Sequence, residues 1–138
     1  MDFAPRTDKQ QLEQGLAFAP KFDENGLIPV ITVDAHNHQV LMMAYMNRET
    51  LRMTLEIGEA VYWSRSRKEI WHKGKTSGQI QRVVEMRTDC DQDAIVLKVE
   101  QRGGGCCHTG SPSCFYRRVP VGAELRASQG EHFPLATA

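Results

Sequence analysis

Two apolar runs separated by a short polar turn constrain the fold of this chain more than any other feature. The runs are "LIPVITVD" at 27–34 and "QVLMMAYM" at 39–46, and the turn between them reads "AHNH". Apolar, β-branched runs of this length with a short polar connection predict a β-hairpin. Similar runs predict further strands at 60–66, 80–87, 94–100 and 114–119.

Helical patterns occupy less of the chain than strand patterns. Asn47 is a suitable N-cap for a helix that carries Leu51 and Leu55 on one face. Gly58 lies near the expected end of this helix, and a shorter amphipathic helix is expected over 7–17. Several strands with one main helix and a short N-terminal helix predict an α+β fold with a largely antiparallel sheet.

The length and charge of the chain limit the classes of protein it can belong to. Its 138 residues suit a single domain over 1–138, with a polar, peripheral tail at 120–138. Lys+Arg and Asp+Glu number 17 each, so the net charge does not favour nucleic acid or an anionic membrane. The N-terminal sequence has no apolar stretch of signal-peptide length, and no window reaches the roughly 20 apolar residues of a membrane span. We therefore expect a cytoplasmic protein whose cysteines stay reduced and serve a metal or catalysis.

Three aspartates alternate along the segment "DCDQDAIVLKVE", at Asp89, Asp91 and Asp93. Clustered carboxylates suit a hard cation such as Mg²⁺. The apolar residues that follow share the parity of the aspartates and should face a core, so we expect the aspartates in a turn at 88–93. A calcium loop would require glycine where this chain has Ala94. A solvated acidic turn without an ion is the other alternative.

All four cysteines lie between Cys90 and Cys114, without the paired CxxC spacing of zinc ribbons. Neighbouring cysteines diverge, which leaves three zinc ligands and an open position, as in catalytic sites. The three ligands are Cys90, Cys107 (or Cys106) and Cys114. A strand at 94–100 carries the chain about 20 Å away from Cys90, and an extended return to Cys107 spans at most about 25 Å. We therefore expect the zinc at a dimer interface, with Cys90 from one chain and the other two ligands from its partner.

The segment "SRSRKEIWHKGKTSG" at 64–78 concentrates groups that suit phosphate oxygens and an aromatic ring. Guanidinium groups, ammonium groups and backbone N–H groups freed by glycine all bind phosphate. "GKT" within the segment lacks the first glycine of a P-loop, which excludes that motif. A solvated basic hairpin is the alternative. The expected substrate-binding residues are Arg65, Arg67, Trp71, Lys73, Lys75 and Ser77.

Two histidines lie within or beside these motifs. His108 directly follows Cys107 and is the first candidate for proton transfer near a metal, and His72 is the second. The remaining three are expected to be ordinary surface or packed residues: His36, His38 and His132.

Three stretches together resemble a known family: "YWSRSRKEIWHKGKTSG", "DCDQDAIVLKVEQ" and "CHTGSPSCFYR". They are similar to phosphoribosyl-AMP cyclohydrolases of histidine biosynthesis, and the likeness covers 27–119. The resemblance implies an intertwined, cytoplasmic, homodimeric hydrolase. In such an enzyme, zinc-activated water hydrolyses the N1–C6 bond of the adenine ring of 1-(5-phosphoribosyl)-AMP and yields the formimino carboxamide ribotide. The implied ligands are Cys90, Cys107 and Cys114 for Zn²⁺, and Asp89, Asp91 and Asp93 for Mg²⁺.

Two other classes of protein use zinc with comparable residues. A nucleic-acid-binding module with a structural zinc predicts four ligands and salt-dependent binding, and the balanced charge of this chain does not favour it. A zinc nucleobase deaminase would carry an H-x-E and a P-C-x-x-C signature, and the sequence contains neither. A cyclohydrolase is therefore the principal expectation, with the structural-zinc module as its alternative.

Overall fold

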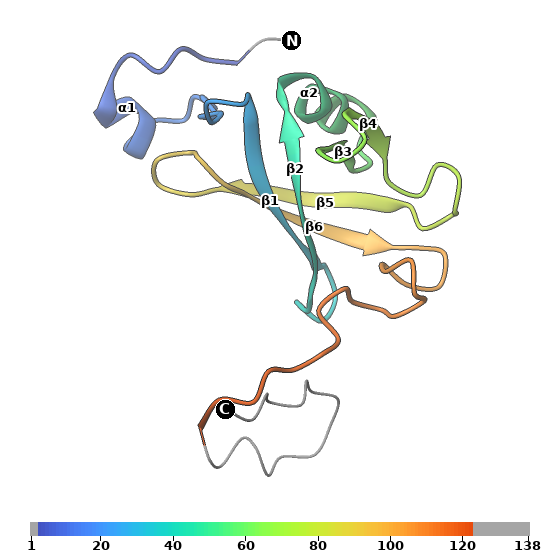
Figure 1. Ribbon diagram of the computed structural model, residues 1–138. Helices are drawn as coiled ribbons and strands as arrows, with labels where there is room; N and C mark the ends of the chain where they lie inside the picture. Colours follow the sequence, from blue (N-terminus) through green and yellow to red (C-terminus); the bar gives the residue numbers. More distant parts are fainter. Residues whose placement is uncertain (1–2, 123–138) are drawn as a thin grey trace.

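The computed structural model describes residues 3–122, which form a curled six-stranded sheet with two helices (Figure 1). The expected α+β class, with one main helix and a short N-terminal helix, is confirmed. His132 and most of the expected peripheral tail, 123–138, lie outside the described residues. The elements in chain order are α1 (Lys9–Gln14), β1 (Leu27–Asp34), β2 (Val40–Asn47), α2 (Arg48–Ile57), β3 (Val61–Ser64), β4 (Glu69–His72), β5 (Gln81–Thr88) and β6 (Ile95–Gln101).

The strand order of the sheet is β4-β3-β2-β1-β6-β5. The predicted hairpin is confirmed, because β1 and β2 pair antiparallel with Ile31 opposite Met43. The sheet is mixed, because β1 and β6 run parallel, with Val30 opposite Ile95, while the pairs β1–β2, β2–β3, β3–β4 and β5–β6 are antiparallel. β2 pairs with one edge of β1, so β6 pairs with the other edge, where it runs parallel to β1. β5 lies outside β6, because the two form an antiparallel hairpin.

The curl of the sheet brings β5 to the start of β3. The backbone N–H of Ala60 donates to Gln81 O at 2.9 Å, and that of Val83 donates to Gly58 O at 2.8 Å. Figure 1 shows β5 and β6 crossing the direction of β1 and β2. The start of β5, the end of β6 and the end of β4 therefore reach the same region from distant parts of the chain.

Helix α2 begins and ends where the sequence predicts. Asn47 Oδ1 accepts from the Thr50 N–H at 2.8 Å, and Thr50 Oγ1 accepts from the Asn47 N–H at 2.9 Å, which forms a reciprocal capping box. Gly58 ends the helix with φ 80°, a left-handed conformation that favours glycine. Leu51 is fully buried on the face of α2 that packs against the sheet.

Alternation along β6 fixes the position of the core. Ile95, Leu97 and Val99 are fully buried, as are Ile28 and Val30 of β1. The aspartates lie in the turn that precedes this strand, as expected. The start of β6 therefore follows the turn that carries the three aspartates, which we call the acidic turn (88–93). The end of β6 leads to the cysteine-rich loop.

Two stretches differ from the sequence-based expectation. Residues 69–72, which lie in the basic segment (64–78) and were not predicted as a strand, form β4 because they pair along β3 in a hairpin. The expected strand at 114–119 does not form, although aromatic and β-branched residues favour one. Cys114 N–H donates to Leu41 O at 2.7 Å, and the chain then continues with Phe115 and Val119 exposed.

Candidate active site

Three of the four cysteines come together in the loop after β6. The Sγ atoms of Cys106 and Cys114 lie 3.9 Å apart, and Cys107 is buried beside them. Gly105 has φ 133°, and a Cβ there would lie 2.8 Å from Ser111 O, so this close approach of two backbone segments requires glycine. We call residues 105–114 the thiol loop.

The thiols of this loop differ in their readiness to ionise. The Thr109 hydroxyl donates to Cys107 Sγ at 3.1 Å and lowers the pKa of that thiol. Burial, followed by the adjacent Cys106, raises the pKa of Cys114 to about 12. Cys114 is exposed as a residue, but its sulfur points at the buried Cys106 and therefore loses solvation. In the absence of a metal, Cys107 is thus the readier thiolate of the two.

The thiol loop is tied to the sheet by buried polar groups. The ammonium of Lys73, a residue only 5% exposed, donates to Cys106 O at 2.7 Å and to Gln79 Oε1 at 3.3 Å. Gln79 Nε2 donates in turn to Cys107 O at 3.0 Å. Lys73 thus holds the loop in place, and its expected contact with phosphate stays a prediction.

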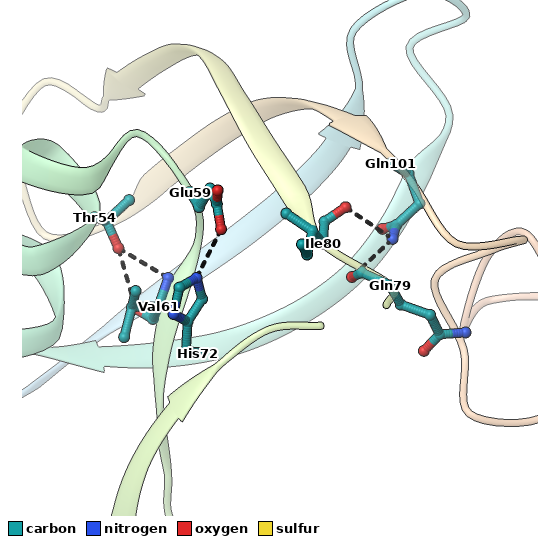
Figure 2. Close-up of polar contacts among 7 residues, drawn as sticks. All are labelled: Thr54, Glu59, Val61, His72, Gln79, Ile80 and Gln101. Atoms are coloured by element: carbon teal, nitrogen blue, oxygen red, sulfur yellow. Dashed lines mark hydrogen bonds and ion pairs between the residues drawn. The ribbon is translucent and has the colours of Figure 1, made fainter. Parts of the chain in front are cut away.

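A second buried chain of hydrogen bonds ends at a sulfur of the loop. The Tyr62 hydroxyl lies 2.7 Å from Thr32 Oγ1 and donates to Gln81 Oε1 at 2.6 Å. Gln81 Nε2 then approaches Cys106 Sγ at 3.7 Å and Gln101 Oε1 at 2.9 Å. Gln101 is itself held by the carbonyls that precede β5, as Figure 2 shows. The core therefore fixes the position of Cys106.

An open cavity of about 310 Å³ lies beside the thiol loop. It brings together six predicted site residues from two separate stretches of sequence, the basic segment and the thiol loop: Arg67, Trp71, Lys73, Ser77, His108 and Cys114. His108 Nδ1 lies 4.0 Å from Cys107 Sγ. Cationic, aromatic, imidazole and sulfur groups converge here.

A larger open cavity of about 600 Å³ shares Arg67 and Trp71 with the first. Arg65 lines it, and its guanidinium stacks 4.0 Å from the centre of the Tyr45 ring. The two cavities together place cationic and aromatic groups along one continuous surface. Lys75 is exposed in the turn that follows β4.

His72 does not join this group within one chain. Side chains alternate along β4, so His72 points to the side opposite Trp71 and Lys73. Its Nε2 lies 2.8 Å from Oε1 of Glu59, which precedes β3, as Figure 2 shows. A catalytic role for His72 stays a prediction that the geometry of a single chain does not favour.

The acidic turn at the other end of β6 is a compact group of carboxylates. Within residues 3–122, Asp89, Asp91 and Asp93 are the one set of three or more potential metal ligands whose donor atoms all lie within 4.8 Å of one another. Hydrogen bonding to Asp89, and then to Asp91, raises the pKa of Asp93 to about 6. Asp89 Oδ1 accepts from the backbone N–H groups of Asp93 and Ala94 at 2.9 and 3.2 Å. The three side chains thus converge before any ion binds.

Cys90 lies in the acidic turn, away from the other thiols. It is exposed and lines an open cavity of about 410 Å³ with α1 and the residues that follow it. The seven residues of β6 separate the acidic turn from the thiol loop by about 20 Å. The structure therefore does not bring Cys90 to Cys107 and Cys114 within one chain.

Some residues of this region were not identified from the sequence. The sequence did contain a signal for Gln81. In a strand it lies on the same inward face as Val83, which places a polar amide where a buried side chain is expected. Gln79 and Thr109 had none, since their contacts arise from the way the two loops pack. Met42, which lines the smaller cavity, is indistinguishable in sequence from an ordinary core residue.

A cavity in which a few polar groups converge is typical of a site that binds a small molecule. The family model described as phosphoribosyl-AMP cyclohydrolase matches residues 42–116. The chain belongs to this family. Neither α1 nor α2, the helices of the described part of the chain, has the length and apolar character needed to span a bilayer.

Individual relatives extend the match beyond the family model. A protein from Nitrobacter hamburgensis is 61% identical over 111 residues, which are 80% of this chain and 75% of the relative. One from Brucella canis is 59% identical over 117 residues, 84% of each chain. One from Rhodopseudomonas palustris is 56% identical over 113 residues, 82% and 75% of the two chains. All three are named phosphoribosyl-AMP cyclohydrolase.

Proposed function

We propose that this chain is a phosphoribosyl-AMP cyclohydrolase. It would hydrolyse the N1–C6 bond of the adenine ring of 1-(5-phosphoribosyl)-AMP to give the formimino carboxamide ribotide, a step of histidine biosynthesis. The observation that carries the proposal is 61% identity to a relative of that name over 80% of the chain. The cavity between the basic segment and the thiol loop supports it, since it joins the residue types that this substrate requires.

The thiol loop fits a soft divalent ion such as Zn²⁺. Tetrahedral zinc with Zn–S bonds near 2.3 Å places its sulfur ligands about 3.8 Å apart, and the Sγ atoms of Cys106 and Cys114 are 3.9 Å apart. The spacing alone favours Cys106 as the partner of Cys114. Cys107 remains our choice, because Thr109 lowers its pKa whereas burial raises that of Cys106. Cys107 and Cys114 would then hold the ion with Cys90 of the partner subunit.

The shared zinc site requires a homodimer, which we propose together with it. The separation of Cys90 from the thiol loop along β6 is its main support. A second support is the sheet face around the β1–β2 pair, where the cross-strand neighbours Ile31 and Met43 are 40% and 41% exposed. Ile70 of β4 is also an exposed apolar residue. Apolar side chains exposed on a sheet are typical of surfaces that bind another chain.

The acidic turn fits a hard cation. We propose that Asp89, Asp91 and Asp93 hold Mg²⁺, because three carboxylates converge there and the ion would neutralise their mutual repulsion. We also place the protein in the cytoplasm, where its four free thiols would stay reduced.

When bound, zinc supplies a Lewis acid that lowers the pKa of water towards about 7 and so provides a nucleophile at neutral pH. The chain's own residues would bind and orient the nucleotide. Arg65, Arg67, Lys75 and Ser77 would hold the two phosphates, and Trp71 would stack on the ring, since it lines both cavities.

His108 would move the proton that this reaction requires. Addition of water at C6 and breakage of the C6–N1 bond leave the water oxygen in a carboxamide. One water proton is transferred to N1, and the other is released from the cationic N1-substituted ring to solvent. His108 lies in the same cavity as Trp71 and beside Cys107, within reach of the site where these bonds change.

The proposal is tested by following ring opening of phosphoribosyl-AMP in the ultraviolet with the purified, zinc-loaded protein. We expect turnover that disappears with a strong chelator and returns when zinc is added back. Adenosine monophosphate is the matched control substrate, because it lacks the N1 phosphoribosyl group that makes C6 electron-poor. Zinc-loaded protein that does not turn over phosphoribosyl-AMP would contradict the proposal.

A further inference from the structure

The segment at 3–22, which lies before the residues matched by the family model, folds back onto the acidic turn. Its contacts converge on Gln92, which lies between Asp91 and Asp93. Gln92 Oε1 accepts from the Ala19 N–H at 2.8 Å, and Nε2 donates to Leu12 O and Ala17 O at 2.8 and 3.3 Å. Gln92 O also accepts from the Lys21 N–H at 2.7 Å. The N-terminal segment therefore binds both the side chain and the backbone of this residue.

Gln92 differs from its neighbours in burial and in backbone conformation. It is only 4% exposed, while Asp89 and Asp91 on the same turn are exposed. Its φ of 57° lies in the left-handed region, which a residue with a long side chain rarely adopts. The bonds to the N-terminal segment thus stabilise a conformation that the turn alone would not favour.

This conformation determines which way the aspartates point. If Gln92 relaxed to an extended conformation, the directions of Asp91 and Asp93 relative to Asp89 would change. A second tether acts on the same turn, because Arg6 donates to Asp91 O at 2.9 Å and also to Ala19 O. The N-terminal segment and the acidic turn are held together at two successive residues.

We propose that Gln92 is a positioning residue for the acidic turn, and that the N-terminal segment acts through it to keep the three aspartates converged on a divalent cation. The proposal rests on the function proposed above, in which these aspartates hold Mg²⁺. Gln92 itself contacts the N-terminal segment rather than the ion.

The test is Mn²⁺ binding to the zinc-loaded full chain, measured by the electron paramagnetic resonance signal of free Mn²⁺. Loss of an outer hydrogen-bonding partner typically weakens metal affinity by about 10–100-fold. We expect Gln92→Ala to bind Mn²⁺ about tenfold more weakly than the wild type. In the activity assay, the Mg²⁺ activation constant should rise by a similar factor, with kcat restored at saturating Mg²⁺.

Gln92→Gly separates tethering from backbone strain. Glycine accepts φ 57° without cost, so this variant folds more readily than Gln92→Ala. Like Gln92→Ala, it lacks the side-chain hydrogen bonds to the N-terminal segment. We expect it to bind Mn²⁺ at least as weakly as Gln92→Ala. Mn²⁺ affinity equal to that of the wild type in Gln92→Gly would overturn the proposal.

Gln101→Ala is the matched control. Gln101 also donates through Nε2 to backbone carbonyls, those of Gln79, Ile80 and Arg102, but at the opposite end of β6. It should leave Mn²⁺ affinity unchanged, and a loss equal to that of Gln92→Ala would reveal general destabilisation instead. No Mn²⁺ binding by the wild type would overturn the magnesium assignment and this proposal with it, whereas wild-type binding that Gln92 variants do not weaken overturns this proposal alone.

Discussion

The two ends of β6 present ligands in different ways. At its start, the acidic turn assembles three carboxylates within 4.8 Å of one another from a single stretch of five residues. Beyond its end, the thiol loop brings Cys106, Cys107 and Cys114 together but lacks Cys90, which the strand holds about 20 Å away. One group of ligands is complete in the chain, and the other, as we propose, is completed by a second copy.

This difference follows from what each end is made of. Alternate residues of a tight turn already lie close together, and a single distant segment, at 3–22, holds this turn through Gln92 and Arg6. The thiol loop instead depends on contacts with β2, on the ammonium of Lys73 and on the Gln81 amide. The two groups thus differ in how far apart in sequence their side chains lie, whereas both are held in place by contacts with distant segments.

The largest expected effect comes from removing a thiol of the loop. Cys107→Ser should lose zinc retention and reduce kcat/KM by on the order of a thousandfold or more, because unassisted water has a pKa near 15.7. Zinc content by atomic spectroscopy, measured alongside the ultraviolet assay, checks both. Cys106→Ser is the adjacent control and should keep both zinc and activity. The reverse result would identify Cys106 as the ligand.

A smaller effect is expected from the ammonium that holds the thiol loop. Lys73→Met removes the hydrogen bonds to Cys106 O and Gln79 Oε1, and hydrogen bonds to charged groups contribute about 1.5–3 kcal/mol. We expect the free energy of unfolding to fall by about 2 kcal/mol in urea titrations. Lys75→Met, at an exposed neighbour, should change it little. Equal stability of the two variants would show that Lys73 does not hold the loop.

The smallest effect concerns the acidic turn without its ion. The folded pKa of Asp93 is raised from 3.8 to about 6, so the folded chain binds this proton more tightly than the unfolded one does. The resulting stability is fully present below about pH 3.8, and it is lost progressively as the pH rises from there through about 6. Asp93→Asn should therefore raise the Tm of the metal-free protein by about 1–2 °C at pH 7, and by less at pH 5. Scanning calorimetry in chelator measures this, and a lower Tm at pH 7 would contradict it.

The sequence predicted the locally determined features of the fold. Asn47 and Gly58 carry chemistry specific to helix ends, and alternation in β6 predicted both its buried face and the acidic turn before it. It did not predict the parallel pairing of β1 with β6, because strand order depends on which edges are free. It also missed β4, a strand of four residues that is stabilised by its pairing with β3.

The candidate site also contains residues whose place could be predicted from the sequence and residues whose contacts could not. Trp71, His108 and Cys114 were predicted separately as site residues, and the structure places them around one cavity. The sequence could not indicate that Lys73 would bond to the thiol loop or that His72 would turn to Glu59, since both outcomes depend on tertiary packing.

The proposal that one zinc site is built from two chains can be tested with two inactive variants. Cys90→Ser and Cys107→Ser are co-expressed with different affinity tags, and the heterodimer is purified through both. In a symmetric dimer, each site would take Cys90 from one subunit and the thiol loop from the other. The heterodimer then contains one site with both substitutions and one with neither.

The decisive measurement is the activity of this heterodimer per dimer. We predict about half of the wild-type value, since one of two sites is intact, while each parent homodimer stays inactive. If each chain builds its own zinc site, every site in the heterodimer carries a substitution. The heterodimer would then be as inactive as its parents, and this result would contradict the shared site.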